Sequence, residues 1–564
     1  MNRAIKKPLA AIIVLCMMMA IIACGNGDSG GGGRTGGGRT TSGEGPFEPF
    51  DRPVTMTMGR GAVNDPAFDD GQDMENNIYI DLIKESLNIE LEYAWLIGDD
   101  YGTRINLVIA SGDMPDVMMV GSRQQLLQLA EAGMLLDLQE AYDRYASPLT
   151  RGFYDSFARP PRCPDGLQAA RHDGLLIGLP NTNIGYQYSL TWIRQDWMDT
   201  VGERPPETLD DIIRIARAFI DLDPGGNGPG NTVGIPSAAH VAGWYNSVTV
   251  LDSVFNLFQS YPRTWVLNES TNEFEYGTIR PETKVALAKL AEMYRDGIID
   301  PQFSTNDENQ VIAAGQAGII FSPWWSPWWP LASTVELGNP DAVWMPYMAP
   351  LAPDGFYYQP YPNPQTNWVV ANTDYAYPEA VVKMVNLTNF MLGQDAEADE
   401  FIPGTTSTHG ETYAMLNRSW TMWPFPLQMI WNDNMLRLGA DLRRNIDAGN
   451  NHADNPSFDM YIQGYNGFLE SPGSNVDHTV MYMNTISVLL QVENDHLLRY
   501  PTLGFPAPTE TMATRWANLQ TLEDQMFLQI IMGHESVDFF DIFVQQWLDQ
   551  GGTQVTQEVN AQLN

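Results

Sequence analysis

The chain has 564 residues, with 31 Lys and Arg against 69 Asp and Glu, so its formal net charge is −38 at pH 7. Such a charge repels polyphosphate backbones and anionic membrane surfaces, which argues against a nucleic-acid-binding protein. The length is sufficient for two or more lobes with an ordinary hydrophobic core.

The first predicted element is a segment that is removed rather than folded. Residues 1–23 begin with Arg3, Lys6 and Lys7 and continue with an unbroken apolar run, Leu9–Ile22. This order is typical of a secretory signal peptide, and the run is too short to span a bilayer comfortably. Without its three basic residues and with no acidic residue lost, the remaining chain carries 28 − 69 = −41 charges.

The sequence Ile21–Gly25, IIACG, resembles a bacterial lipobox. The resemblance implies cleavage before Cys24, lipidation of its sulfur including palmitate, and attachment to the outer face of the cell membrane through lipid alone. An ordinary signal peptide with an incidental cysteine is the alternative. Residues 24–46 are mostly Gly, Ser, Thr and charged residues, which predicts a flexible linker with a reach of roughly 25 Å. Cys163 is then the one remaining thiol, so no intrachain disulfide is expected.

Strands and helices alternate in the next part of the chain. Hydrophobic periodicity and turn residues predict strands at 53–58, 89–95 and 117–120, and helices at 77–88, 101–110 and 124–132. This alternation is typical of βαβ units and predicts a parallel sheet.

The same order of elements returns in the middle of the chain. Strands are predicted at 189–194, 317–321 and 367–370, and helices after Asp196, after Thr208, at 281–295 and from Pro378. Helices near 509–532 and 537–550 end the chain, whereas residues 404–473 show no clear pattern. The fold class predicted from these elements is α/β, with two lobes.

Five blocks resemble the extracytoplasmic solute-binding proteins of bacterial ABC importers, family 1, in the branch of large Gram-positive lipoproteins. The blocks occur in the family's order and are Asn106–Asp116, Leu175–Pro180, Trp192–Met198 with Pro205–Asp210, Leu290–Phe303, and Ile530–Gly533 with Trp547–Gly552. The resemblance implies a two-lobed, periplasmic-binding-protein-like fold of type II, with a ligand in the interlobe cleft and closure about a hinge.

The lobe boundaries follow from this resemblance. We expect an N-terminal lobe of residues 47–185 plus 362–425 and a C-terminal lobe of residues 186–361 plus 426–564. The crossing segments are expected near 180–189 and 361–368, with a third past Gly404.

Four tryptophans stand in the segment FSPWWSPWWP, residues 321–330. Flat indoles suit the apolar C–H faces of sugar rings, and the family carries a similar turn at this place, which implies a cleft position. We expect the strand to end at Phe321. Trp324 and Trp325 are expected to form the ligand platform, whereas Trp328 and Trp329 are expected to pack against the protein. Trp328 is also a candidate ligand contact. Weaker aromatic candidates are Tyr186, Tyr188, Trp192, Trp423 and Trp431.

Arg60 and Arg123 follow the first and third predicted strands. Ligands of open α/β sheets bind beyond the carboxyl ends of strands, which makes Arg60, Ser122 and Arg123 candidate contacts. Asp113 and Asp116 are expected to brace a turn rather than to bind ligand.

The segment 221–234 resembles the EF-hand-like calcium loop that some members carry. The ligands implied by the resemblance are Asp223, Asn227, the carbonyl of Pro229, and Asn231. Gly225 stands in place of a further ligand and Thr232 in place of an acidic residue, so little negative charge faces the site. A glycine-rich turn without calcium is the alternative; no cofactor is otherwise required.

No sequence motif points to catalysis: HExxH and Walker patterns are absent, and the GxSxG spacing (residues 27–31) and the GxGxxG spacing (residues 25–30 and 31–36) occur only in the glycine-rich linker, where no strand and helix are predicted to flank them. We therefore expect a monomeric, lipid-anchored receptor rather than an enzyme, which captures an oligosaccharide and delivers it to an ABC transporter permease. The alternatives are a surface glycoside hydrolase and a receptor for a non-sugar solute such as a peptide.

Overall fold

The computed structural model describes residues 43–563 apart from 63–67, 69–70, 99, 159–165, 183–187, 244–246, 338, 340, 361–362, 364, 393–400, 410–421, 428 and 456–457. The described residues lie in one of two units of the chain, residues 41–564. The predicted signal peptide, Cys24 and Cys163 lie outside them.

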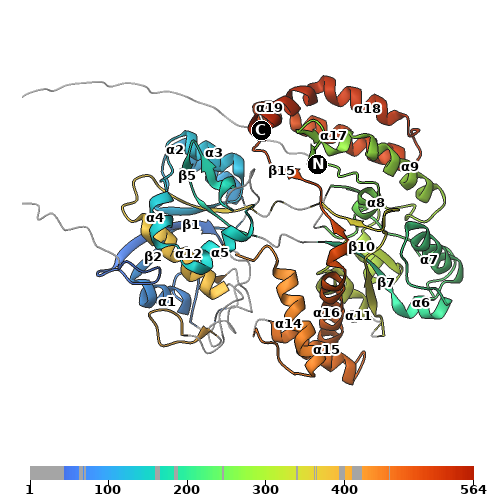
Figure 1. Ribbon diagram of the computed structural model, residues 1–564, viewed down its shortest axis with the longest axis horizontal. Coiled ribbons are helices and arrows are strands. Elements are labelled where there is room, and N and C mark those ends of the chain that lie inside the picture. The colour runs from blue at the N-terminus through green and yellow to red at the C-terminus, as the bar shows by residue number, and fades with distance from the viewer. Residues whose placement is uncertain are drawn as a thin grey trace, which may run out of the picture. The chain divides into compact units, whose positions relative to one another are not determined.

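The first lobe contains a five-stranded sheet in the order β2-β1-β3-β13-β6. Its first two strands, β1 and β2, are labelled in Figure 1. The strands are β1 (Val54–Gly61), β2 (Ile89–Ile97), β3 (Val117–Val120), β6 (Leu179–Pro180) and β13 (Trp368–Ala371). β1 runs parallel to β2 and β3, as the alternation of elements predicts, and β13 is antiparallel to β3 and β6.

The helices of this lobe begin and end at residues that the sequence marks. The amide of Asn77 accepts the backbone N–H groups of Tyr79 and Ile80, and Gly112 ends α2 in the left-handed conformation. The helices are α1 (Ile78–Leu87), α2 (Tyr101–Ser111), α3 (Arg123–Glu131), α4 (Gln139–Tyr145), α5 (Pro148–Ser156) and α12 (Pro378–Leu392), and the short elements are η1 (Gln168–Ala170), β4 (Arg171–His172) and β5 (Leu175–Leu176). The six elements predicted between residues 53 and 132 are confirmed within a few residues.

The second lobe is built around a three-stranded antiparallel sheet, β10-β7-β11. Its strands are β7 (Ser189–Arg194), β10 (Ile319–Pro323) and β11 (Trp344–Tyr347), and its smaller strands are β8 (Trp265–Asn268), β9 (Glu273–Tyr276), β12 (Tyr357–Tyr358), β14 (Leu498–Arg499) and β15 (Leu503–Gly504). The prediction that β10 ends at Phe321 is wrong, since Pro323 still pairs with Ser189. β10 is an edge strand of this sheet, where a residue without an N–H is tolerated.

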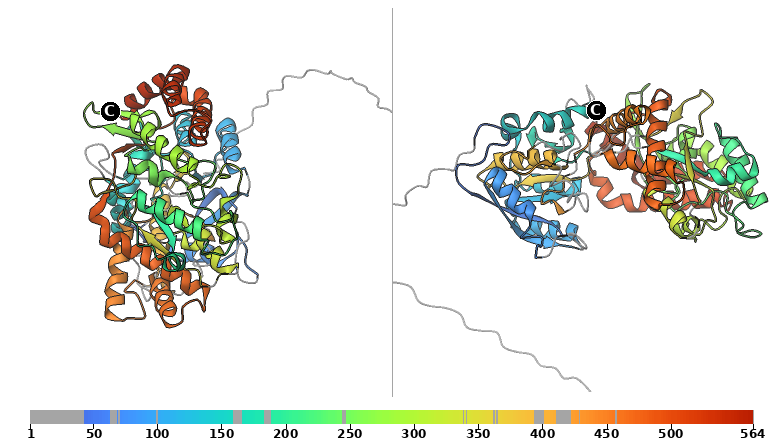
Figure 2. Two further views of the ribbon diagram at one scale, coloured as in Figure 1. Left: turned by 90° about the vertical axis from the view of Figure 1, so that its right-hand side faces the viewer. Right: turned by 90° about the horizontal axis from the view of Figure 1, so that it is seen from below.

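Helices cover this sheet and extend beyond it. They are α6 (Gln195–Val201), α7 (Leu209–Leu222), α8 (Asp252–Leu257), η2 (Gly277–Ile279), α9 (Pro281–Arg295), α10 (Glu308–Ala313), η3 (Pro327–Leu331), α11 (Ala332–Glu336), α14 (Asn434–Ala448), α15 (Asp459–Glu470), α16 (Val476–Asn494), η6 (Asp495–Leu497), α17 (Glu510–Ile531), α18 (Phe539–Trp547), η7 (Leu548–Gly552) and α19 (Thr553–Leu563). Helices α14, α15 and α16 pack side by side (orange in Figure 2), and the first two occupy much of the stretch in which the sequence shows no clear pattern.

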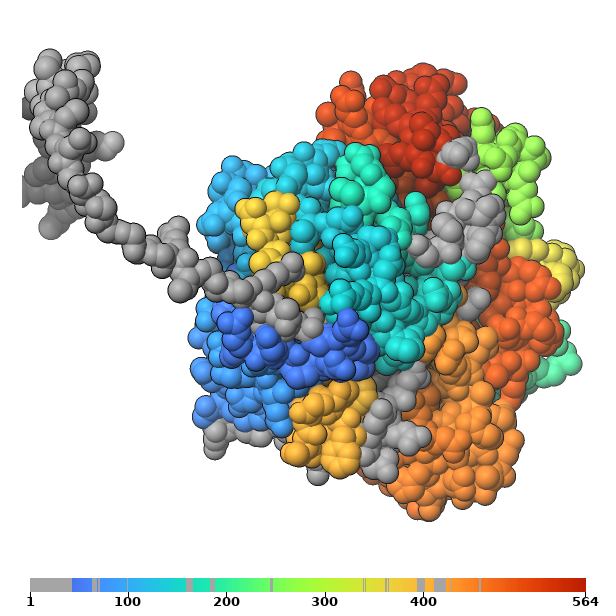
Figure 3. Space-filling view, turned by 60° about the vertical axis from the view of Figure 1, so that its left-hand side comes forward, coloured from blue at the N-terminus to red at the C-terminus, as the bar shows by residue number. Residues whose placement is uncertain are grey.

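Buried apolar residues form separate clusters for the two parts of the chain. One cluster draws on residues 50–179 and 368–429, and two others draw on residues 188–357 and 435–559. On the surface of the first lobe, the first described residues of the chain lie beside α12 (dark blue and yellow in Figure 3).

Three segments connect the two lobes, and hydrogen bonds join them to one another. The side-chain oxygen of Asn181 accepts the backbone N–H of Asn367 at 2.8 Å, and the N–H of Asn181 donates to the carbonyl of Asn367 at 2.8 Å. The hydroxyl of Thr182 donates to the carbonyl of Ile430 and accepts its N–H, both at 2.8 Å. The first connection is therefore hydrogen-bonded to each of the other two.

Candidate functional site

The connections leave the first lobe at the edge where its parallel strands end. Trp368, the first residue of β13, pairs with Val120 at the end of β3 and with Pro180 at the end of β6. The carboxyl ends of β1, β2 and β3 therefore lie along the edge from which the chain crosses to the second lobe. This edge is where ligands of α/β sheets bind.

The tryptophan segment begins at the corresponding edge of the second lobe. The N–H of Trp324 donates to the carbonyl of Tyr188, the last residue before β7, at 3.1 Å. The hydroxyl of Ser487 on α16 donates to the carbonyl of Trp324 at 3.1 Å. The aromatic turn is thus fixed beside the first connection between the lobes.

The burial of the four indoles is the reverse of the predicted order. Trp324 is only 7 % exposed and Trp325 is partly buried against the same core, whereas Trp328 is 37 % and Trp329 is 50 % exposed. The prediction that the second pair is packed more closely than the first is therefore wrong, and the choice of the ring that contacts ligand stays a prediction. The cause is that β10 continues through Pro323 and delivers Trp324 into the core, and η3 then turns the second pair outward.

The Trp328 ring packs against two other aromatic rings. The Trp328 ring meets the Trp324 ring edge-on at a centroid distance of 5.7 Å and the Tyr461 ring at 6.0 Å. Such edge-to-face contacts restrict an indole that still presents apolar surface. The most exposed of the four indoles are therefore those of Trp328 and Trp329.

The other aromatic candidates near the connections are buried. Tyr188 is fully buried, its hydroxyl donates to the carbonyl of Ser487 at 2.9 Å, and burial raises its pKa well above the ordinary value. Trp192 is also fully buried, and Trp423 donates its indole N–H to the hydroxyl of Thr388. These three side chains pack rather than present surface; Tyr186 lies outside the described residues.

Trp431 lies at the third connection, where its ring packs on Phe153 at 4.7 Å. The guanidinium of Arg437 lies over the same indole at 4.1 Å. A Cβ on Gly152 would come within 2.7 Å of this ring, which explains the glycine on α5. Trp431 is therefore held between the helices of the two lobes.

Arg60 is 3 % exposed at the end of β1. Its guanidinium donates to the backbone carbonyls of Trp423 at 2.8 Å and Pro424 at 3.1 Å. Burial lowers its pKa, which is only partly offset by Tyr93. The group joins β1 to the third connection, which is a different role from the ligand contact that the sequence suggested.

Arg123 and Ser122 follow β3 at the lobe edge. The hydroxyl of Ser122 caps α3 by accepting the N–H of Gln125 at 3.5 Å. A terminal nitrogen of Arg123 donates to the carbonyl of Phe505 in the second lobe at 3.1 Å, while its Nε is buried without a hydrogen-bond partner. Burial lowers the pKa of Arg123. Arg123 thus lies between the lobes, where the sequence placed it.

Asp116 braces the sheet, as the sequence predicts. Its carboxylate accepts both the N–H of Thr57 at 2.8 Å and the hydroxyl of Thr57 at 2.7 Å. This pairing fixes the turn before β3 against β1.

One aromatic side chain at this edge, that of Trp95, is not among the candidates predicted from the sequence. Trp95 on β2 lies over Gly59, where a Cβ would come within 2.2 Å of the indole. Its ring is 5.5 Å from that of Tyr101 and 5.3 Å from the guanidinium of Arg104. A glycine opposite a tryptophan would have indicated this contact, but Gly59 and Trp95 are known to face each other only once the register of β1 and β2 is known.

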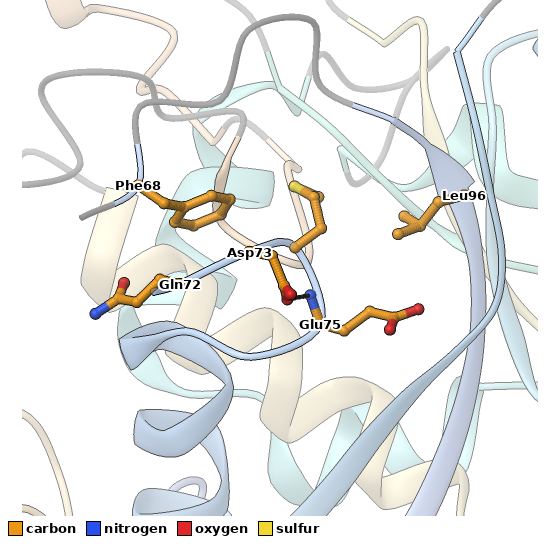
Figure 4. Close-up of a pocket in the computed structure, with 6 residues that line it drawn as sticks. Phe68, Gln72, Asp73, Glu75 and Leu96 are labelled. Atoms are coloured by element: carbon orange, nitrogen blue, oxygen red, sulfur yellow. Dashed lines mark hydrogen bonds between the residues drawn. The ribbon is translucent and has the colours of Figure 1, made fainter. Parts of the chain in front are cut away.

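A cavity of about 390 Å³ lies on the other face of the same strand. Figure 4 shows its lining residues, Phe68, Gln72, Asp73, Met74, Glu75 and Leu96. The carboxylate of Asp73 accepts the N–H of Glu75 at 2.9 Å, which closes the turn that forms the wall. Two carboxylates make this cavity suited to hydroxyl or cationic groups.

The glycine-rich segment is a closed turn whose polar groups satisfy one another. One oxygen of the Asp223 carboxylate accepts the hydroxyl of Thr232 at 2.5 Å and the N–H of Asn227 at 3.0 Å, and the other accepts the N–H of Gly228 at 2.8 Å. The hydroxyl of Thr232 is the largest of the causes that lower the pKa of Asp223.

This turn does not fit the calcium loop that the sequence resembles. The Asn231 amide donates to the carbonyl of Asn227 at 2.9 Å, and Pro229 is exposed. Both oxygens of the one carboxylate in the turn face hydrogen-bond donors, whereas calcium requires several oxygen ligands around one point. Across the part of the chain that the structure describes, no group of three or more His, Cys, Asp or Glu could hold a metal ion.

No helix among the described residues is both long and apolar enough to cross a membrane.

Comparison with known proteins places the fold. The chain resembles the alginate-binding protein AlgQ2, at 15 % identity and a TM-score of 0.54, covering 93 % of this chain and 100 % of that one. It also resembles an HMO-binding, ABC-transporter-associated solute-binding protein from Bifidobacterium longum infantis, at 15 % identity and a TM-score of 0.59, covering 91 % and 99 %. These neighbours share the two-lobed α/β architecture.

Curated relatives match a shorter stretch. Lipoprotein LipO of Bacillus subtilis is 26 % identical over 240 residues, 41 % of this chain and 43 % of that protein. FusA of Streptococcus pneumoniae, a fructooligosaccharide ABC transporter substrate-binding protein, is 24 % identical over 230 residues. These residues cover 40 % of this chain and 42 % of FusA. The chain thus matches less than half the length of these relatives.

The sequence model of a single family matches residues 78–398, which is more than half of the chain. The matched stretch contains β2, β3 and β13, the first two connections between the lobes, and the exposed tryptophans. The chain therefore belongs to the family of bacterial extracellular solute-binding proteins.

Proposed function

We propose that this protein captures an oligosaccharide outside the cytoplasm and delivers it to the permease of an ABC importer. Its family and structural neighbours bind solutes and are not enzymes. The observation that carries the choice of a saccharide is the exposed pair Trp328 and Trp329, held on a turn that is hydrogen-bonded to a lobe connection. Rigid indoles at such a place suit the C–H faces of sugar rings.

The names of relatives support the same class of ligand. FusA is named for fructooligosaccharides, and YtcQ of Bacillus subtilis, 21 % identical over 242 residues, for polygalacturonan and rhamnogalacturonan. Capture proceeds by closure of the lobes, proposed as residues 47–185 plus 362–425 and residues 186–361 plus 426–564, about the three connected segments.

The proposal extends to attachment through the lipid on Cys24, which is supported by the lipobox resemblance and by the name of LipO. The Cys24→Ala variant is expected to leave the membrane fraction of producing cells and to appear in the medium. Persistence of this variant in washed membranes would contradict lipid attachment. We propose a monomer in solution, which sedimentation tests.

The decisive experiment is a saccharide panel of neutral and acidic trisaccharides titrated into the purified protein. Binding is expected to change tryptophan fluorescence reversibly and to raise the melting temperature, since a ligand that binds only the folded state stabilises it by mass action. Chromatography of the same samples checks for products. Release of shorter sugars would favour a glycoside hydrolase, and a shift with peptides alone would overturn the choice of saccharide.

A further inference from the structure

Two arginines at the edge of the first lobe retain polar groups without a partner. The Nε atoms of Arg104 and Arg123 are both buried and lack a hydrogen-bond acceptor. Neither guanidinium forms an ion pair within the described residues. A partly buried arginine is ordinarily paired, because desolvation of an unpaired charge is costly.

The two side chains belong to one continuous surface. Arg104 lies over the Trp95 ring, and Tyr101, beside the same ring, donates its hydroxyl to the carbonyl of Met119 at 2.6 Å. Met119 lies near the end of β3, and Arg123 begins the helix that follows it. The amide of Gln125 joins the two helices by donating to the carbonyl of Gly102 at 2.9 Å.

This surface lies at the edge from which the connections leave, and Arg123 already contacts Phe505 of the second lobe. The chain carries 38 more negative than positive charges, yet none of the carboxylates that the structure describes forms an ion pair with Arg104 or Arg123. The acidic cavity formed by Asp73 and Glu75 opens beside Leu96, whose side chain points to the face of β2 opposite to that of Trp95.

We infer that Arg104 and Arg123 bind a carboxylate of the ligand while Trp95 contacts its sugar ring, so that the saccharide carries uronic acid residues. The inference rests on the proposed function and specifies its ligand class. Guanidinium groups recognise carboxylates through paired, charge-assisted hydrogen bonds, and an adjacent half-buried indole supplies a flat apolar surface.

Calorimetric titration with trigalacturonate, trimannuronate and the fully methyl-esterified form of each tests this inference. The esters keep the rings but lose the charge. The acidic sugars are expected to bind at least about tenfold more tightly than their esters, because hydrogen bonds to charged groups are the stronger ones. Maltotriose and kestose complete the panel as neutral sugars.

Arg104→Gln and Arg123→Gln are expected to weaken acidic-sugar binding about tenfold each and to bring the acid-to-ester ratio of dissociation constants close to one. Arg123→Lys keeps the positive charge and is expected to lose less affinity for the acidic sugars than Arg123→Gln. Arg217→Gln is the matched control, because Arg217 on α7 is exposed, donates to the carbonyl of Asp296, and its replacement removes the same charge far from this edge. Melting curves verify that each variant is folded.

The outcomes separate the two claims. If the esters or neutral trisaccharides bind as tightly as the acids, or if both glutamine variants retain the preference for the acid, the inference is overturned while a saccharide receptor stands. If no saccharide of either kind binds, the proposed function and the inference fall together. A preference for the acid that Arg217→Gln reduces equally would reflect overall charge and would also overturn the assignment.

Discussion

Trp324 and Tyr188 are joined by a hydrogen bond from the N–H of the first to the carbonyl of the second at 3.1 Å. The bond ties the start of the aromatic turn to the connection between the lobes. Because the Trp324 side chain lies in the core, the turn divides its rings into a fixed base and an exposed pair. The position that sequence favoured for ligand contact is therefore the one that supports the turn.

Replacement of Trp324 and of Trp329 should separate stability from binding. Trp329→Ala removes an exposed ring and is expected to weaken saccharide binding about tenfold with little change in unfolding free energy. Trp324→Ala opens a buried space and is expected to cost about 3–5 kcal/mol of stability. Urea unfolding and calorimetric titration measure the two effects. Normal stability with lost binding in Trp324→Ala would reverse the assignment.

The glycine-rich turn should be indifferent to calcium. Because the Asp223 carboxylate is satisfied by Thr232, Asn227 and Gly228, neither millimolar calcium nor a chelator is expected to shift the melting temperature. Asp223→Asn is expected to lower it, since the amide keeps only one of the two acceptor oxygens and turns an NH2 donor toward the remaining donors. The same loss is expected on acidification, because a carboxyl with a lowered folded pKa stabilises only above its folded pKa. A calcium-dependent rise in melting temperature would contradict the closed turn.

Glu523 on α17 should make stability depend on pH. Burial raises its pKa to about 7 from an ordinary value of 4.5, although Arg263 lies 3.7 Å away. The folded protein therefore binds the proton more tightly, and the free energy of unfolding is expected to fall as pH rises from about 4.5 to about 7.

Glu523→Gln is expected to remove this fall and to be more stable than the native chain at pH 8 by up to about 3 kcal/mol. Asp524→Asn serves as the control, because Asp524 is half-exposed and also pairs with Arg263. Urea unfolding at pH 5 and pH 8 measures both. An unchanged pH dependence in the glutamine variant would refute the assignment to Glu523.

Lys383 on α12 should hold the start of the described body in place. Its ammonium is buried and donates to the carbonyls of Gly45 at 2.7 Å, Glu48 at 2.5 Å and Gly43 at 3.3 Å. Lys383→Met keeps the volume but removes these bonds, so faster amide exchange is expected in residues 43–50. Lys289→Met, at a partly exposed position on α9, is the control. Equal exchange in both variants would show that other contacts hold the segment.

Local elements could be predicted because their causes are local. The Thr208 hydroxyl accepts the N–H of Asp211 and the Asp211 carboxylate accepts that of Thr208, the capping box that opens α7. Apolar and polar residues alternate in β2, which indicates a strand with one face buried. The continuous apolar run of β3 indicates a strand with both faces buried. The family blocks follow the same elements, and their order was sufficient to indicate the family.

The contacts of the site depend on residues far apart in the chain. Arg60 follows a strand in the sequence as a ligand-binding arginine would, but its guanidinium is held by the carbonyls of residues more than 360 positions later. Trp95 lies over Gly59 only because a bulge in the pairing of β1 and β2 sets these two residues opposite each other. Neither relationship has a local pattern.

The sequence by itself determined the alternation of strands and helices, and with it the α/β class, and the aromatic turn, because periodicity, caps and prolines act over a few residues. The resemblance of the ordered blocks indicated the family and its two-lobed fold. Only the tertiary structure decided which indoles are buried, which arginine is held by backbone carbonyls, and which arginines keep unpaired donors. Burial and pairing depend on the register of strands and on contacts between distant segments, which a linear pattern does not record.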